Sequence, residues 1–133
     1  MIFITGPAWQ GKTEFAESLL SRRKAAPEAA SETRADGEMC GMEDIFGADL
    51  VFHFEAYVRR FGRMLEDPEA LVKRLRAANS ETILVAAEVG CGVVPLDPEE
   101  RFWRERCGRI CTEIAAQAEA VYRVICGIPM RLK

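Results

Sequence analysis

Short apolar runs alternate with longer amphipathic segments along this chain of 133 residues. Apolar runs at 2–5, 49–55 and 82–87 have the length and composition of buried strands. The segments that follow the first two runs, at 11–23 and at about 56–65, place apolar residues three or four positions apart, as an amphipathic helix does. Because predicted strands alternate with predicted helices, we expect an α/β domain whose sheet is mainly parallel.

Two later helices have clear start signals. Asp67 precedes Pro68 and Asp97 precedes Pro98, which is the arrangement of a helix N-cap followed by proline in the first turn. The first of these helices should end near Ala78. The second carries one apolar stripe, formed by Trp103, Cys107, Ile110, Cys111, Ile114 and Ala118.

The rest of the chain is expected to form a surface loop and a hairpin. Residues 24–41 are small and polar and are interrupted by proline and glycine, so we expect little regular structure there. Strands at 121–126 and 130–133, separated by residues 127–129, should close the sheet as an antiparallel hairpin.

The glycine-rich segment GPAWQGKT, at residues 6–13, matches the pattern G-x-x-x-x-G-K-[ST] between a predicted strand and a predicted helix. In that context backbone N–H groups and the helix N-terminus form a cradle for phosphate groups. Lys12 is expected to reach the outer phosphates, and the hydroxyl of Thr13 to bind Mg²⁺. The alternative is a chance match in a glycine turn. The residues expected to contact the nucleotide are Gly6, Pro7, Ala8, Trp9, Gln10, Gly11, Lys12 and Thr13.

An enzyme of this kind needs a second acid to complete the magnesium shell, and two glutamates end apolar runs. Glu88 is the preferred candidate for catalysis and metal binding, because a glycine-bearing loop begins there, and Glu55 is the other. The alternative for Glu88 is a solvated carboxylate at a strand end. His53, the single histidine, is either a core residue or a group that lines the site near the carboxyl end of a strand. We count it as a candidate catalytic residue beside Lys12 and Glu88.

Composition narrows the classes of function. The formal net charge is −3 and the sequence pI is about 5.3, so no basic field favours nucleic acid as a partner. No apolar run approaches the ~20 residues of a membrane span, and the N-terminus lacks the basic region of a signal peptide. Five cysteines, without a C-x-x-C pair, favour reduced thiols in a cytoplasmic protein. The length suits a single nucleotide-binding domain over residues 1–133.

Several segments together resemble a known family. The loop EVGCGVVP at 88–95, the Gly-Arg pair at 108–109 and the run VYRVICGI at 121–128 accompany the glycine-rich loop. In this combination the chain is similar to the adenosylcobinamide kinase/adenosylcobinamide-phosphate guanylyltransferase family of cobalamin biosynthesis. The resemblance implies a P-loop NTPase-like (RecA-like) fold, with helices on both faces of a mainly parallel sheet and a C-terminal antiparallel hairpin. It also implies ATP or GTP with Mg²⁺, adenosylcobinamide as the corrinoid substrate, and a homotrimer.

The middle of the chain departs from this family. The family carries there a basic helix with the histidine that is guanylylated during transfer, whereas residues 31–49 contain no histidine and little basic charge. The resemblance therefore favours the kinase step, in which a terminal phosphate moves to the aminopropanol hydroxyl of adenosylcobinamide. It leaves guanylyl transfer without its usual carrier, and we expect no guanylylation of His53. Two alternatives stay open: a non-catalytic nucleotide- or corrinoid-binding partner protein, and a small-molecule P-loop kinase with another substrate.

Overall fold

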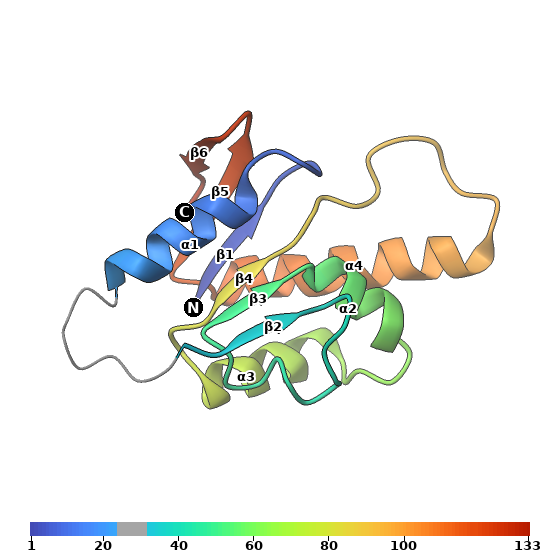
Figure 1. The fold of residues 1–133 in the computed structure, drawn as a ribbon. Helices are drawn as coiled ribbons and strands as arrows, with labels where there is room; N and C mark the ends of the chain where they lie inside the picture. The colour runs from blue at the N-terminus through green and yellow to red at the C-terminus, as the bar shows by residue number, and fades with distance from the viewer. Residues whose placement is uncertain (24–31) are drawn as a thin grey trace.

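Residues 1–23 and 32–133 are described by the computed structural model, in which six strands form one sheet (Figure 1). The strands are β1 Ile2–Thr5, β2 Arg34–Asp36, β3 Leu50–Phe52, β4 Ile83–Val85, β5 Ala120–Ile125 and β6 Ile128–Arg131. The helices are α1 Lys12–Arg23, α2 Phe54–Phe61, α3 Pro68–Ala78 and α4 Pro98–Gln117. The strand order is β2-β3-β4-β1-β5-β6, and neighbouring strands are parallel except β5 and β6. The predicted α/β class and the C-terminal hairpin are confirmed, and β1 lies in the interior of the sheet.

Helices cover both faces of the sheet, as predicted, with α1 on one face and α2, α3 and α4 on the other (Figure 1). Alternate residues of β1 divide between the two layers. Ile2 and Ile4 pack with Ala16 and Leu20 of α1. Phe3 packs in the larger apolar cluster with the other three helices. This alternation sets the register of β1, and therefore the direction in which the chain leaves its carboxyl end, where the glycine-rich loop begins.

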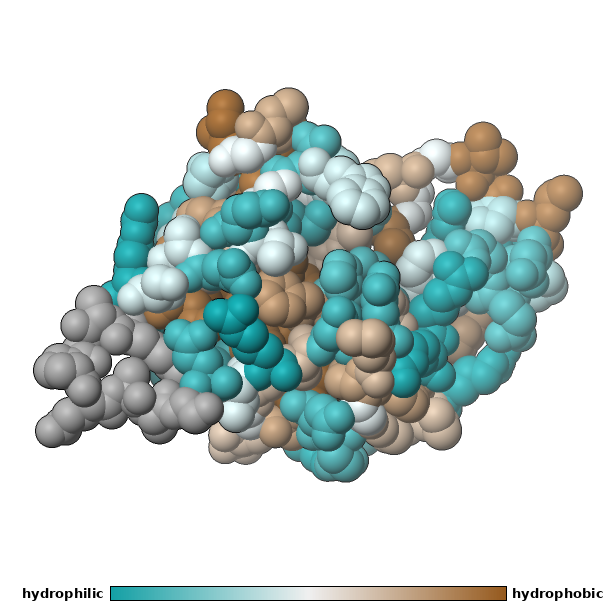
Figure 2. Space-filling model, viewed as in Figure 1, coloured by the Kyte–Doolittle hydropathy of each residue, from teal (hydrophilic) through white to brown (hydrophobic). Residues whose placement is uncertain are grey.

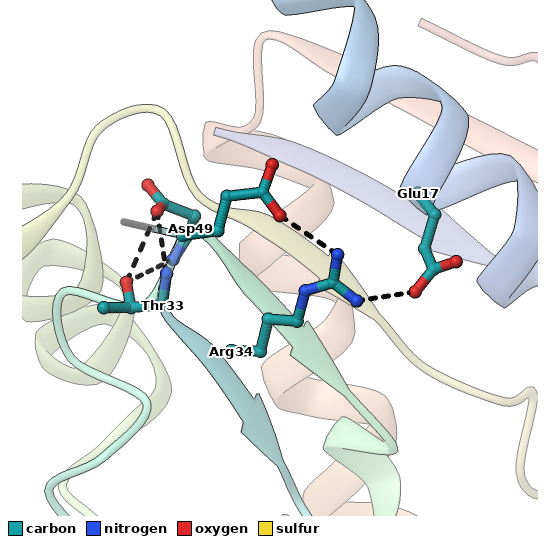
Figure 3. A network of polar contacts seen from close by, with 5 residues as sticks. Glu17, Thr33, Arg34 and Asp49 are labelled. Atoms are coloured by element: carbon teal, nitrogen blue, oxygen red, sulfur yellow. Dashed lines mark hydrogen bonds and ion pairs between the residues drawn. The ribbon is translucent and has the colours of Figure 1, made fainter. Parts of the chain in front are cut away.

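An edge strand, β2, lies in the segment that was expected to have little regular structure, so that prediction is wrong for residues 34–36. Residues 24–31, which the same prediction covered, lie outside the described residues. Polar contacts hold β2 in place (Figure 3). Arg34 pairs with Glu17 of α1 at 2.8 Å, and the backbone N–H of Thr33 donates to Asp49, next to β3, at 3.1 Å. A strand of three residues is too short to show a hydrophobic period in the sequence.

The strand expected at 49–55 is shorter, because β3 ends at Phe52 and α2 begins at Phe54. His53 lies between them as the helix N-cap residue, with a left-handed backbone (φ 48°) that turns the chain from strand to helix. The apolar run continues across this junction because the first residue of α2 is also fully buried. Glu55 therefore lies in the first turn of a helix and not at the end of a strand.

Both predicted helix starts are confirmed. Asp67 accepts hydrogen bonds from the backbone N–H groups of Glu69 and Ala70, and Asp97 accepts one from Glu99. Each aspartate thus satisfies backbone donors that the first turn of a helix leaves unpaired. Within the described part of the chain, no helix combines the length and apolar character needed to cross a membrane.

The hairpin turn lies earlier than predicted. Cys126 and Gly127 join β5 to β6, and both have positive φ (52° and 75°), as a two-residue hairpin turn of type I′ requires. Pro129, which was expected in the turn, pairs with Val124 as part of β6. Because β6 is an edge strand, a residue without a backbone N–H is tolerated there.

Candidate functional site

The glycine-rich loop spans residues 6–11, between β1 and α1. Gly6 has a φ of 145°, and a β-carbon there would lie 2.3 Å from the backbone oxygen of Val124, so only glycine fits. Gln10 ties the loop to the hairpin turn. Its side-chain oxygen accepts a hydrogen bond from the N–H of Cys126 at 2.8 Å, and its backbone oxygen accepts one from Gly127 at 3.0 Å. Contacts within the protein therefore set the shape of the loop.

Lys12, the first residue of α1, is buried at 9% exposure. Its ammonium group donates a hydrogen bond to the backbone oxygen of Pro7 at 2.6 Å. Burial lowers the pKa of Lys12, while the charges of Glu55 and Glu88 oppose that shift. The cation is thus held inside the loop by a neutral carbonyl oxygen, and a phosphate oxygen would replace that carbonyl as a stronger acceptor.

A cleft of about 570 Å³ opens beside the loop. It is lined by residues 8–14, by Glu38, His53 and Glu55, and by Val85 and Ala87. The structure thus brings Lys12, Thr13, His53 and Glu55 to one cleft, together with the predicted nucleotide contacts at residues 8–11. Glu88 is not among the described residues that line it.

Glu55 presents its carboxylate to this cleft. Oε2 accepts a hydrogen bond from the backbone N–H of Ala87 at 2.8 Å, which fixes the carboxylate beside the carboxyl end of β4. From the other side, the indole N–H of Trp103 in α4 donates to the backbone oxygen of Glu55 at 2.8 Å. Within residues 1–23 and 32–133, no donor is bonded to Oε1, so this oxygen is available to a ligand.

Glu88, the acid favoured by the sequence pattern, is held by an arginine. Its carboxylate oxygens accept hydrogen bonds from Nε and Nη2 of Arg123, at 2.7 and 2.8 Å. The hydrogen bonds to Glu88 and its negative charge raise the pKa of Arg123. To bind a ligand in the cleft, Glu88 would have to give up part of this forked pair. Sequence reasoning missed Arg123, although a charged residue inside the otherwise apolar run AVYRVI was a visible signal.

His53 lies in the cleft beside two carboxylates that were not predicted, Asp36 and Glu38. Nδ1 of His53 is 2.9 Å from Oδ1 of Asp36. Partial burial lowers the pKa of His53, but the hydrogen bond to Asp36 and the surrounding carboxylate charges raise it by more. Gly37 permits the close approach, because a β-carbon there would lie 2.1 Å from the backbone oxygen of His53. The imidazole is therefore more protonated near neutral pH than an ordinary histidine.

Two sets of side chains at the cleft have the chemistry of metal ligands. Thr13 and Glu55 offer a hydroxyl and a carboxylate oxygen, which are the donors that Mg²⁺ prefers. Asp36, Glu38 and His53 each offer one atom within 4.8 Å of the others, a mixed oxygen and nitrogen set that suits transition metals better. Only the first set includes a residue of the glycine-rich segment. The first set therefore has the donor chemistry of a magnesium site beside the loop.

Comparison with known proteins points to one family. Residues 50–132 match the model of the family described as cobinamide kinase / cobinamide phosphate guanyltransferase. The bifunctional adenosylcobalamin biosynthesis protein CobU of Escherichia coli is 32% identical over 65 residues, which are 49% of this chain and 36% of that protein. The protein of the same name from Salmonella typhimurium is 32% identical over 72 residues, which are 53% of this chain and 40% of that protein. The corresponding protein CobP of Pseudomonas aeruginosa is 37% identical over 71 residues, 53% of this chain and 41% of its own length. The matched segments thus span less than half of each relative.

Proposed function

Because the chain belongs to the family of cobinamide kinases / cobinamide phosphate guanyltransferases, we propose that it is a nucleotide-dependent adenosylcobinamide kinase. In this reaction the aminopropanol hydroxyl of adenosylcobinamide attacks the terminal phosphorus of ATP or GTP, and the bond from that phosphorus to the bridging oxygen breaks. The observation that carries the proposal is the preformed phosphate loop, with Lys12 buried inside it and Glu55 in the same cleft.

Lys12, Thr13 and Glu55 have separate roles in this proposal. The backbone N–H groups of the loop bind the phosphates, and the ammonium group of Lys12 exchanges the oxygen of Pro7 for a phosphate oxygen. Thr13 and Glu55 would hold Mg²⁺, which neutralises phosphate charge when bound. Glu88 is still proposed to bind the metal or the substrate hydroxyl, because it follows an apolar run at the start of a glycine-bearing loop. Its pairing with Arg123 makes Glu55 the better supported of the two glutamates.

The test is turnover of ATP and GTP with and without adenosylcobinamide. We expect nucleoside diphosphate and adenosylcobinamide phosphate to form in equal amounts, and only when the corrinoid is present. Nucleotide binding without turnover would favour the non-catalytic partner protein. Turnover that does not respond to adenosylcobinamide would favour a kinase with another substrate.

Guanylyl transfer through His53 is not expected. A nucleophilic imidazole must be neutral, whereas the carboxylates around His53 raise its pKa and also repel an incoming triphosphate. GTP labelled at the α-phosphate should therefore leave no acid-labile, base-stable label on the protein at neutral pH. His53→Gln, which cannot form a phosphoramidate of this kind, serves as the control. Stoichiometric label on the wild-type chain that is lost in His53→Gln would contradict this prediction and restore a two-step enzyme.

We also propose that the chain assembles as the homotrimer that the family resemblance implies. The edge strand β6 and the residues after it support an assembly, because Ile128, Met130 and Leu132 are 66%, 42% and 61% exposed. An open strand edge with apolar side chains is commonly covered by a partner. Light scattering should give three times the monomer mass over a wide range of concentrations. A monomer mass throughout that range would remove the proposal.

A further inference from the structure

Trp9 is 99% exposed although it is a large aromatic residue in the middle of the phosphate loop. Its backbone has a φ of 60°, a left-handed conformation that is unfavourable for a residue with a β-carbon. The other tryptophan is different, because Trp103 donates its ring N–H to Glu55 and has the guanidinium of Arg59 4.7 Å from its ring centre. Across the described residues, Trp9 has no comparable partner. Contacts among residues 1–23 and 32–133 therefore give no reason for an indole at this position.

A second group of exposed apolar side chains lies on the loop between β4 and α4. Val93, Val94 and Leu96 are 89%, 73% and 95% exposed. The backbone of this loop is nevertheless held, because Arg104 donates to the oxygen of Val93 at 3.0 Å and Arg101 to that of Leu96 at 2.7 Å. Apolar side chains stand out in brown on this part of the molecule, at the upper right of Figure 2. The two arginines thus fix a loop whose apolar side chains remain in solvent.

The two apolar groups arise at the same edge of the sheet. They follow the carboxyl ends of β1 and β4, which are paired strands. The backbone N–H of Glu88, where the second loop begins, donates to the oxygen of Gly6, where the phosphate loop begins, at 3.0 Å. Trp9 itself lines the cleft that contains Lys12 and Glu55. Trp9 therefore presents apolar surface next to the charged groups that would act on a phosphate, and the loop that carries 93–96 begins at the same edge of the sheet.

We propose that Trp9 is the platform on which the flat ring system of the corrinoid acceptor stacks, while the loop at 93–96 contacts the edge of that ring. This inference rests on the proposed kinase function and names the residues that would select the acceptor. The loop N–H groups bind the nucleotide through its phosphates, so the indole ring is left for the second substrate. A corrin ring is broad and only slightly puckered, and its rim carries methyl groups beside its amide side chains. The adenosyl group covers one face, so the other face suits an indole ring and the methyl groups suit aliphatic side chains. A purine base is smaller, so either the indole ring or the aliphatic side chains alone would cover it.

Equilibrium dialysis with adenosylcobinamide tests the proposal without turnover. Trp9→Ala should raise the dissociation constant for adenosylcobinamide about tenfold, and Trp9→Phe should restore most of the affinity, because a ring can still stack. The dissociation constant for ATP with Mg²⁺ should rise by less than about threefold in both variants, because the backbone N–H of residue 9 is kept. Met64→Ala, which removes an exposed apolar side chain outside the cleft, is the matched control and should change neither constant.

Acrylamide quenching gives a second readout. In Trp103→Phe, Trp9 is the remaining tryptophan, so the quenching constant reports its exposure directly. Saturating adenosylcobinamide should lower this constant severalfold, whereas ATP with Mg²⁺ should leave it nearly unchanged. Protection by ATP instead would assign Trp9 to the purine base and overturn the proposal. Equal corrinoid affinity of wild type and Trp9→Ala would also overturn it, with the kinase proposal intact. No corrinoid binding by the wild-type chain would overturn the kinase proposal and this inference together.

Discussion

Replacing Lys12 by alanine should lower phosphoryl transfer by about 10²–10³-fold or more, because the lost ammonium group is aimed at charge that develops on the transferred phosphate. The residue has little other function in the described fold. Its charged group makes one hydrogen bond, to the backbone oxygen of Pro7, and its burial already lowers its pKa. Rates of nucleoside diphosphate release, measured at saturating ATP and adenosylcobinamide, give the comparison with wild type.

The same variant should remain folded. Removing the bond to Pro7 should cost about 1 kcal/mol of unfolding free energy, a typical value for one hydrogen bond. In a domain of this size, thermal unfolding should then shift by only a few degrees. Lys73→Ala is the control, because Lys73 lies on the surface of α3 and pairs with Glu69. A Lys12→Ala protein that turns over substrate as fast as Lys73→Ala would show that the glycine-rich loop is not the active site.

The second large effect is expected for Glu55→Gln. The substitution keeps the size of the side chain and its hydrogen bond to Ala87, but removes the negative charge beside the cleft. We expect kcat to fall by about 100-fold with little change in the KM for nucleotide, as for a group that acts mainly in the transition state. A titration of activity against Mg²⁺ should also shift to higher concentration, because a metal ligand has been weakened.

Glu88→Gln is the matched variant, since it makes the same chemical change on the other glutamate that follows an apolar run. We expect it to lower turnover by less, because the carboxylate of Glu88 is committed to Arg123. If Glu88→Gln lowers kcat more than Glu55→Gln does, the carboxylate that acts on metal or hydroxyl is Glu88. That outcome would also mean that the pair with Arg123 opens when substrates bind.

Sequence reasoning succeeded where a local rule acts alone. An apolar run followed by two glycines predicts the strand Ile2–Thr5, the glycine-rich loop and the start of α1. Glycine can adopt the backbone conformations that this loop requires. The helix at Asp67 follows from a side chain that bonds the N–H groups two and three residues later. In each case the residues that signal the element are neighbours in the chain, although the shape of the glycine-rich loop also depends on contacts with Val124 and Cys126.

The failures come from contacts between distant segments. The run VFHFEAYV is apolar on both sides of His53, so its period did not reveal where the strand stops and α2 begins. Glu55 and Glu88 both end apolar runs, and only the fold shows that one meets Ala87 and the other Arg123. The short strand β2 likewise depends on partners far along the chain, since Arg34 bonds to Glu17 in α1. Single-sequence patterns do not contain such pairings.

The bond between Gln10 and Cys126 joins residues 116 positions apart. During translation the phosphate loop is therefore synthesised more than a hundred residues before the turn that supports it. A nascent chain that contains β1 and α1 alone has the residues that bind phosphate, but not the β5–β6 turn that shapes them. Nucleotide affinity should thus appear only once the hairpin has joined the sheet. A nucleotide would then stabilise the completed fold selectively, because it binds the native state and not the partly made one.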